Sequence, residues 1–222
     1  MLLKNGERIV FTGDSVTDSG RKRPVGDGLW EGTGTGFVRL VESFLNVFYP
    51  ERLIRVSNTG NSGDTSKALL NRFDTDVISL KPNYVVICIG FNDVWRHFDE
   101  PTITEGHVGT KEYKANLEKM ADLCAKEGIK AIFMTPYYME LNEQDAMRKM
   151  TVEYATEMKL VAQEKGLPCI DLQPAFDQLL QYRYPAYLSW DRVHPGHTGS
   201  MLIATEFLKF AGFDFDRIKG GI

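Results

Sequence analysis

Short apolar runs that alternate with helical patterns constrain the fold of this chain most strongly. The runs have the continuous apolar character of strands buried on both faces of a parallel sheet, and they cover residues 9–13, 53–58, 84–89, 129–134 and 167–172. Helical patterns lie between and after them, at residues 37–48, 67–73, 77–80, 111–127, 143–165, 174–181 and 196–210. This alternation predicts an α/β fold, a three-layer α/β/α sandwich around a five-stranded parallel sheet. No repeat or linker interrupts the pattern, so we expect one domain over residues 1–222.

The first predicted strand ends abruptly at Gly13, and a small polar cluster containing Ser15 follows it. Ser15 is therefore expected just beyond the carboxyl end of a buried strand, the edge of an open α/β sheet where ligands bind. Gly63 and Asn92 follow the second and third strands in the same way. If strands one and three are neighbours, as in the flavodoxin-like order, these strand exits share one topological switch point.

Asp191 and His194, near the other end of the chain, are the partners that a nucleophilic serine needs. A serine hydroxyl is a weak nucleophile until a base takes its proton, and the base works best when a third group fixes its tautomer. Each segment alone has a plainer interpretation. A serine after Gly-Asp is more often a helix N-cap or turn residue, and Asp191 to His194 alone resembles a solvated turn capped by an aspartate.

Four motifs in order give the chain a family resemblance. They lie at residues 13–18, 58–65, 90–93 and 191–195, with Ser15, Gly63, Asn92 and His194 each in one of them. In these motifs the chain resembles the SGNH (GDSL-type) esterases and acylhydrolases, which implies the flavodoxin-like SGNH hydrolase fold. The less specific segments 92–96, 135–138 and 142–145 are most similar to those of intracellular acetylxylan (xylo-oligosaccharide) esterases.

The resemblance assigns the roles. Ser15 is expected to attack the acyl carbonyl, His194 to accept its proton and later return it to the leaving alcohol, and Asp191 to orient His194. The resemblance also selects the oxyanion hole among several polar residues at the strand exits: the backbone N–H groups of Ser15 and Gly63 and the side-chain amide of Asn92. Neutral, fixed donors of this kind require no metal or cofactor.

The substrate is inferred from aromatic residues and from the same resemblance. Flat aromatic faces suit a sugar ring, although aromatics near a cleft are as often simple packing. Together with the resemblance they favour removal of a small acyl group, acetyl, from a carbohydrate. Asp14 beside the nucleophile is expected either to cap the turn or to contact substrate, and Asp18 to cap or fix a loop. The residues expected to bind substrate are Asp14, Trp95, Arg96, Tyr184 and Trp190.

Three other functions fit parts of this pattern. The first is an SGNH lysophospholipase, thioesterase or arylesterase, which would share the mechanism and differ in its acyl ester. The second is a catalytically silent flavodoxin-like binding module, against which the intact Ser15, Asn92, Asp191 and His194 argue. The third is a glycosidase that uses Asp14 and Asp18 as paired carboxylates.

Composition excludes several classes of partner. The net charge of −4 argues against nucleic acid, and no apolar stretch is long enough to span a bilayer. The start of the chain lacks signal-peptide features, so we expect a cytoplasmic protein. The glycine-rich segment 18–36 lacks the spacing of a nucleotide-binding loop. The three cysteines are expected to be structural thiols, and the resemblance to acetylxylan esterases implies a homo-oligomer.

Overall fold

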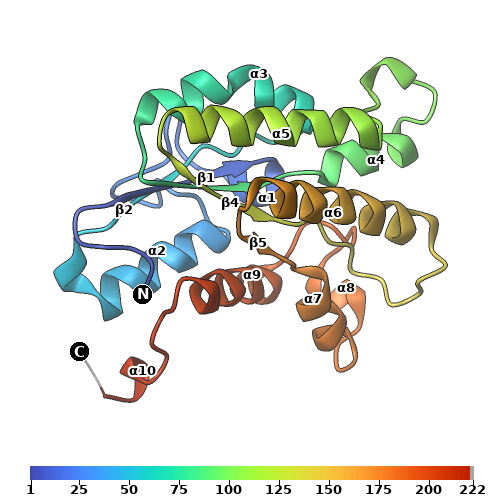
Figure 1. Ribbon diagram of the computed structural model, residues 1–222. Helices are drawn as coiled ribbons and strands as arrows, with labels where there is room; N and C mark the ends of the chain where they lie inside the picture. The colour runs from blue at the N-terminus through green and yellow to red at the C-terminus, as the bar shows by residue number, and fades with distance from the viewer. Residues whose placement is uncertain (221–222) are drawn as a thin grey trace.

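The computed structural model describes residues 1–220 and has three layers, with helices on both faces of a central sheet (Figure 1). All strand pairs are parallel, and the strand order is β2-β1-β3-β4-β5, so β1 and β3 are neighbours as in the flavodoxin-like order. The strands are β1 (Arg8–Gly13), β2 (Arg55–Asn58), β3 (Tyr84–Cys88), β4 (Lys130–Met134) and β5 (Cys169–Ile170). The predicted fold class is confirmed.

Alternating side chains of the strands divide the core into two parts. Ile9 and Phe11 of β1 pack into one cluster, whereas Val10 between them packs into the other, as successive residues of a strand point to opposite faces. Helices α2 (Phe37–Phe48), α7 (Gln173–Leu180) and α9 (His197–Phe210) contribute to the first cluster. The second contains residues of α3 (Ser66–Asp76), α5 (Thr110–Lys126) and α6 (Ala146–Lys165). The sheet is therefore buried on both faces.

Short helices complete the described chain. They are the α-helices α1 (Ser15–Asp18), α4 (Phe91–Asp99), α8 (Pro185–Leu188) and α10 (Arg217–Gly220) and the 3₁₀ helices Pro50–Arg52, Ile78–Leu80 and Thr104–Gly106. Among residues 1–220, no helix has both the length and the apolar character needed to cross a membrane.

Most predicted elements are present with boundaries within three residues of the prediction, whereas several helices were not predicted. The fifth strand is only Cys169–Ile170, because β4 pairs with it through two residues alone. Helix α6 begins at Ala146 instead of residue 143, where the Asp145 side chain caps it by accepting the Arg148 N–H. Helix α4 was not predicted and begins directly after β3.

The ends of β1, β2 and β3 determine where the candidate site lies. Phe11 is in register with Asn58 of β2, and Gly13 with Cys88 of β3, so these parallel strands end at the same edge of the sheet. Gly13 has φ +156°, and a Cβ added there would lie 1.9 Å from the Cys88 carbonyl oxygen. The strand exit therefore requires glycine at this position, immediately before Asp14 and Ser15.

Candidate active site

Ser15 is the first residue of the short helix α1, at the end of β1. Asp14 is its N-cap, and its Oδ1 accepts the Val16 N–H at 3.0 Å. The expected capping role of Asp14 is confirmed. Its side chain has no exposed surface, so the expectation that Asp14 contacts substrate was wrong: the residue lies beneath the site instead of lining it.

Ser15, His194 and Asp191 form one chain of hydrogen bonds. His194 Nε2 lies 2.7 Å from Ser15 Oγ, and His194 Nδ1 lies 2.5 Å from Asp191 Oδ2. The other carboxylate oxygen of Asp191 accepts hydrogen bonds from the backbone N–H groups of Val193 and His194 and from the Ser189 hydroxyl. The turn that carries the histidine is thus built around the carboxylate that orients it.

The electrostatics of this chain suit proton transfer. Burial acts to raise the pKa of Asp191, but the hydrogen bonds from His194 and from backbone N–H groups outweigh it and lower that pKa to about 2. Asp191 is therefore ionised. Its hydrogen bond raises the pKa of His194 above the ordinary value against an opposing effect of burial, which makes the imidazole a stronger base toward the Ser15 hydroxyl.

The three predicted oxyanion donors have N–H groups without protein partners. Within residues 1–220, the backbone N–H groups of Ser15 and Gly63 donate to no protein atom. The Asn92 amide donates one N–H to the Asp64 carbonyl at 3.0 Å, and its other N–H has no acceptor in the described chain. Gly63 has φ +88°, a conformation that favours glycine. These groups are available to a ligand.

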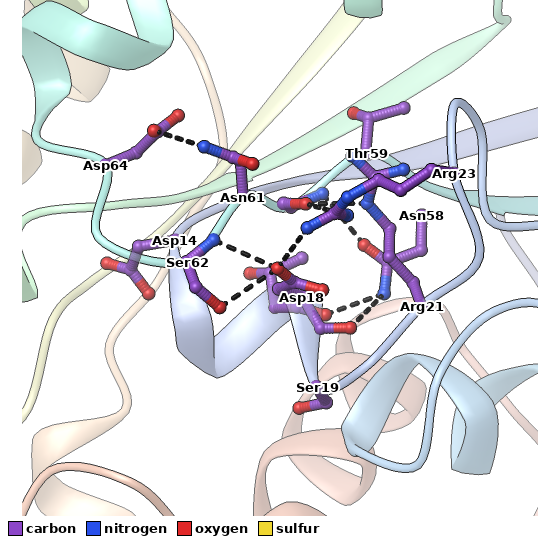
Figure 2. Close-up of polar contacts among 12 residues, drawn as sticks. Asp14, Asp18, Ser19, Arg21, Arg23, Asn58, Thr59, Asn61, Ser62 and Asp64 are labelled. Carbon is purple, nitrogen blue, oxygen red and sulfur yellow. Dashed lines mark hydrogen bonds and ion pairs between the residues drawn. The ribbon is translucent and has the colours of Figure 1, made fainter.

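The loop that carries Gly63 is fastened by Asp18 (Figure 2). Asp18 Oδ2 accepts from the Ser62 N–H at 3.0 Å and the Ser62 hydroxyl at 2.9 Å, and it pairs with Arg23 Nη2 at 2.6 Å. Burial opposes the ionised form, but these hydrogen bonds prevail and lower the pKa of Asp18. The predicted loop-fixing role of Asp18 is confirmed, and its Oδ2 makes all three of these contacts.

Arg72 of α3 also holds these segments together, and the sequence analysis did not identify it. Its guanidinium donates to the carbonyl oxygens of Gly13 at 2.9 Å and Thr59 at 2.6 Å and pairs with Asp64 Oδ2 at 2.6 Å. It also contacts Asp76, one turn along the same helix. Arg72 thus joins the exit of β1 to the loop after β2. No local pattern marks this role, because the partners come from three separate segments.

Asp93 connects α4 with α3. Its carboxylate accepts the backbone N–H of Ser66 at 2.9 Å and the Ser66 hydroxyl at 2.5 Å. Burial raises the pKa of Asp93 to about 7, although the hydrogen bonds from Ser66 oppose this. Asp93 therefore holds the first residue of α3 against the helix that carries Asn92.

The predicted aromatic substrate residues lie around His194. The Trp95 ring centroid is 5.4 Å from the imidazole centroid, and Trp190 stacks on the same ring at 6.3 Å with an interplanar angle of 3°. Trp190 and Tyr184 are 84% and 76% exposed and share the lining of a pocket of about 350 Å³. A second pocket, of about 320 Å³, opens directly beside Ser15 and His194.

Arg96 and the three histidines other than His194 have varied surroundings. Arg96 donates to the Asn92 side-chain oxygen at 3.0 Å. The rings of His97 and His107 contact each other in a tilted arrangement with centroids 4.3 Å apart, and His197 lines the pocket beside Ser15. All three thiols are free; Cys88 and Cys124 are buried and Cys169 is half-buried. In the described part of the chain, no group of three or more potential His, Cys, Asp or Glu ligands comes together for a metal ion.

The chain and its structure are similar to those of known acetylxylan esterases. An acetylxylan esterase from Geobacillus stearothermophilus is 45% identical over 220 residues, which cover 99% of this chain and 100% of the relative. The crystal structure of Axe2, an acetylxylan esterase from the same organism, matches with a TM-score of 0.94 at 44% identity, covering 96% of this chain and 98% of Axe2. Other Axe2 structures are of its catalytic mutants S15A, D191A and H194A.

A third similar structure comes from a different source. LAE5, an α/β hydrolase enzyme from the metagenome of Lake Arreo, Spain, matches with a TM-score of 0.93 at 42% identity, covering 96% of this chain and 98% of LAE5. The model of the GDSL-like lipase/acylhydrolase family matches residues 11–202, a range that includes every residue of the hydrogen-bonded chain from Ser15 to Asp191. The four sequence motifs, the SGNH hydrolase fold and these matches agree: the chain belongs to the GDSL-like lipase/acylhydrolase family.

Proposed function

We propose that this protein is a serine esterase that removes acetyl groups from carbohydrate, with acetylated xylo-oligosaccharides as its substrates. The observation that carries the proposal is the continuous chain of hydrogen bonds from Ser15 through His194 to Asp191. The Axe2 catalytic mutants concern the same three residue types at the same three numbers, which supports these residues as the triad. Residues 1–222 act as one hydrolase domain in this proposal.

The geometry accounts for acyl transfer in two steps. Ser15 Oγ attacks the acetyl carbonyl carbon while His194 Nε2 takes the hydroxyl proton. The carbonyl oxygen becomes an oxyanion, which the Ser15 N–H, the Gly63 N–H and the free Asn92 N–H stabilise. The C–O bond to the sugar then breaks, and His194 returns the proton to the leaving alcohol. Water, deprotonated by the same imidazole, then attacks the acetyl-enzyme and releases acetate and free Ser15.

Carbohydrate specificity is supported by the surroundings of the site and by the relatives. Axe2 is described as an acetyl-xylooligosaccharide esterase, and the exposed rings of Trp190 and Tyr184 offer flat faces for sugar packing. The pocket beside Ser15 is lined in part by polar residues, among them Ser19, Thr35 and Ser200, which suits a small acetyl group better than a lipid tail. Cytoplasmic location stays a prediction from the sequence, and homo-oligomeric assembly stays a prediction from the resemblance.

The test measures acetate release from acetylated xylo-oligosaccharides by the wild-type protein and by Ser15→Ala, with nitrophenyl octanoate as a second substrate. We expect rapid acetate release that is lost in the variant, little octanoate cleavage, and labelling of wild-type Ser15 by a fluorophosphonate. Octanoate cleavage without acetate release would support the serine mechanism and indicate that the substrate is a different acyl ester. Activity retained in Ser15→Ala would refute the mechanism.

A further inference from the structure

Arg96 lies one helical turn after Asn92 on α4, and its guanidinium is fixed at both ends. Nη2 donates to Asn92 Oδ1 at 3.0 Å, and Nη1 pairs with Asp99 Oδ2 at 2.6 Å. Glu100 adds a longer ion pair at 3.9 Å. The Arg96 side chain is only 27% exposed and Asn92 is 3% exposed. The contact between them is therefore shielded from solvent, and both ends of the arginine fork are occupied.

This contact determines which way the Asn92 amide faces. A guanidinium has only donors, so the atom that it contacts must be the amide oxygen. The NH₂ group then points the other way, toward the loop after β2, where it donates to the Asp64 carbonyl at 3.0 Å. Asp64 directly follows Gly63, so the amide is held between α4 and the loop that supplies another proposed donor. One N–H remains without a protein acceptor among the described residues.

The same contact strengthens that remaining N–H as a donor. A hydrogen bond from a cation to an amide oxygen draws electron density from the amide, and hydrogen bonds in a chain polarise one another. Asp99 and Glu100 partly neutralise the guanidinium but lie on its other side, bound through Nη1, whereas Nη2 faces the amide. The polarisation therefore acts on the Asn92 amide directly.

We propose that Arg96 is a positioning residue for oxyanion stabilisation: it orients and polarises the Asn92 amide, so that the free N–H faces the developing charge. This inference rests on the proposed esterase function. It gives Arg96 a role different from the predicted contact with the sugar, and the two roles have separate kinetic signatures. A positioning residue changes kcat, whereas a residue that binds the sugar alone changes KM for the sugar.

A double-mutant cycle tests the proposal, with nitrophenyl acetate as a substrate that lacks the sugar. Wild type, Arg96→Met, Asn92→Ala and the double variant are compared. We expect Arg96→Met to lower kcat about 10-fold with KM changed less than about 2-fold, and Asn92→Ala to lower kcat roughly 100-fold or more. In the Asn92→Ala background the Arg96 substitution should have almost no further effect, because the amide through which it acts is gone.

Controls separate positioning from helix stability and from failure of the proposed function. Lys114→Met removes ion pairs on the exposed side of α5, including an i,i+4 pair like that of Arg96, and should leave kcat unchanged. Arg96→Lys, which keeps the charge, should have a kcat between those of Arg96→Met and wild type. It replaces Arg96→Met in the double-mutant cycle if Arg96→Met does not fold. Equal loss of kcat from the Arg96 substitution in both backgrounds, or a change in KM alone, would overturn the Arg96 proposal while leaving the esterase standing. An inactive wild type would overturn both proposals.

Discussion

At the scale of single residues, Asp14 is a buried carboxyl directly before the nucleophile Ser15, and its pKa is raised. Burial raises the pKa of Asp14 to about 8, and the nearby Asp93 and Asp64 add to this, while the Val16 N–H and His194 oppose it. Its Oδ2 is buried without a protein partner in the described chain. At neutral pH the folded protein therefore holds Asp14 mainly as a neutral acid.

The raised pKa makes the contribution of Asp14 to stability pH-dependent. Between pH of about 4 and about 8 the carboxyl is ionised in the unfolded chain and protonated in the folded one, so folding takes up a proton and stability falls as pH rises, by about 1.4 kcal/mol per pH unit. The neutral Asp14→Asn removes this term and keeps an oxygen for the Val16 N–H. We therefore expect the free energy of unfolding of the variant, measured relative to that of wild type by urea denaturation, to increase from pH 5 to pH 7.

The matched control for Asp14→Asn is Asp122→Asn, which removes a carboxyl that is 63% exposed on its side chain. Its difference from wild type should be nearly the same at both pH values, because the substitution changes only the exposed surface of α5. Parallel pH dependences for wild type and Asp14→Asn would show that Asp14 is ionised in the folded protein.

At the scale of elements, the site depends on how three strand exits are joined, and Arg72 connects the exits of β1 and β2. Arg72→Met would leave the Gly13 and Thr59 carbonyls without this donor and the buried Asp64 carboxylate without its cation. Breaking a buried pair on one side costs about 3 kcal/mol or more. We expect a loss of that size in urea denaturation and a fall in kcat, because the exits that carry Ser15 and Gly63 are no longer tied together.

An exposed ion pair provides the comparison for Arg72. Lys209→Met removes the pair with Glu206 on α9, in which the lysine side chain is 59% exposed, and such pairs contribute less than about 1 kcal/mol. If Arg72→Met cost no more than Lys209→Met, the guanidinium would not be holding the strand exits together.

The elements also show what sequence can and cannot predict. Strand-exit reasoning placed Ser15, Gly63 and Asn92 at one edge of the sheet, because parallel strands end together whatever the details of packing. The motif resemblance, not the strand order, indicated His194 as the partner of Ser15. Helix α4 was missed although Phe91, Val94, Trp95 and Phe98 follow helical spacing, since polar residues dilute the signal. The partners of Arg72 and Arg96 could not be predicted, because a guanidinium can reach many oxygens and only the folded arrangement selects among them.

At the scale of the whole molecule, the site joins the two ends of the chain. Ser15 and His194 are 179 residues apart in sequence, and the parallel sheet brings the first strand exit to the turn before α9. The nucleophile is backed by buried groups, whereas the base is flanked by the exposed ring of Trp190. The reacting atoms therefore lie at the boundary between a rigid sheet edge and an open aromatic surface, where a large substrate can bind and a small acyl group can react.

Trp190→Ala tests whether that aromatic surface recognises the sugar. Removing the ring should raise KM for acetylated xylo-oligosaccharide about 10-fold, because stacking on the sugar is lost, while kcat/KM for nitrophenyl acetate changes less than about 3-fold, since Ser15, His194 and Asp191 keep their hydrogen bonds. Leu53→Ala is the control: Leu53 is 77% exposed just before β2, at the amino ends of the strands. Neither the KM for the oligosaccharide nor kcat/KM for nitrophenyl acetate should change in this variant.

Light scattering on each variant reports the assembly, for which the resemblance predicts a mass above 25.1 kDa. An equal loss on both substrates would show that Trp190 supports His194 instead of the sugar, and a loss that follows a change of mass would assign the ring to subunit contact.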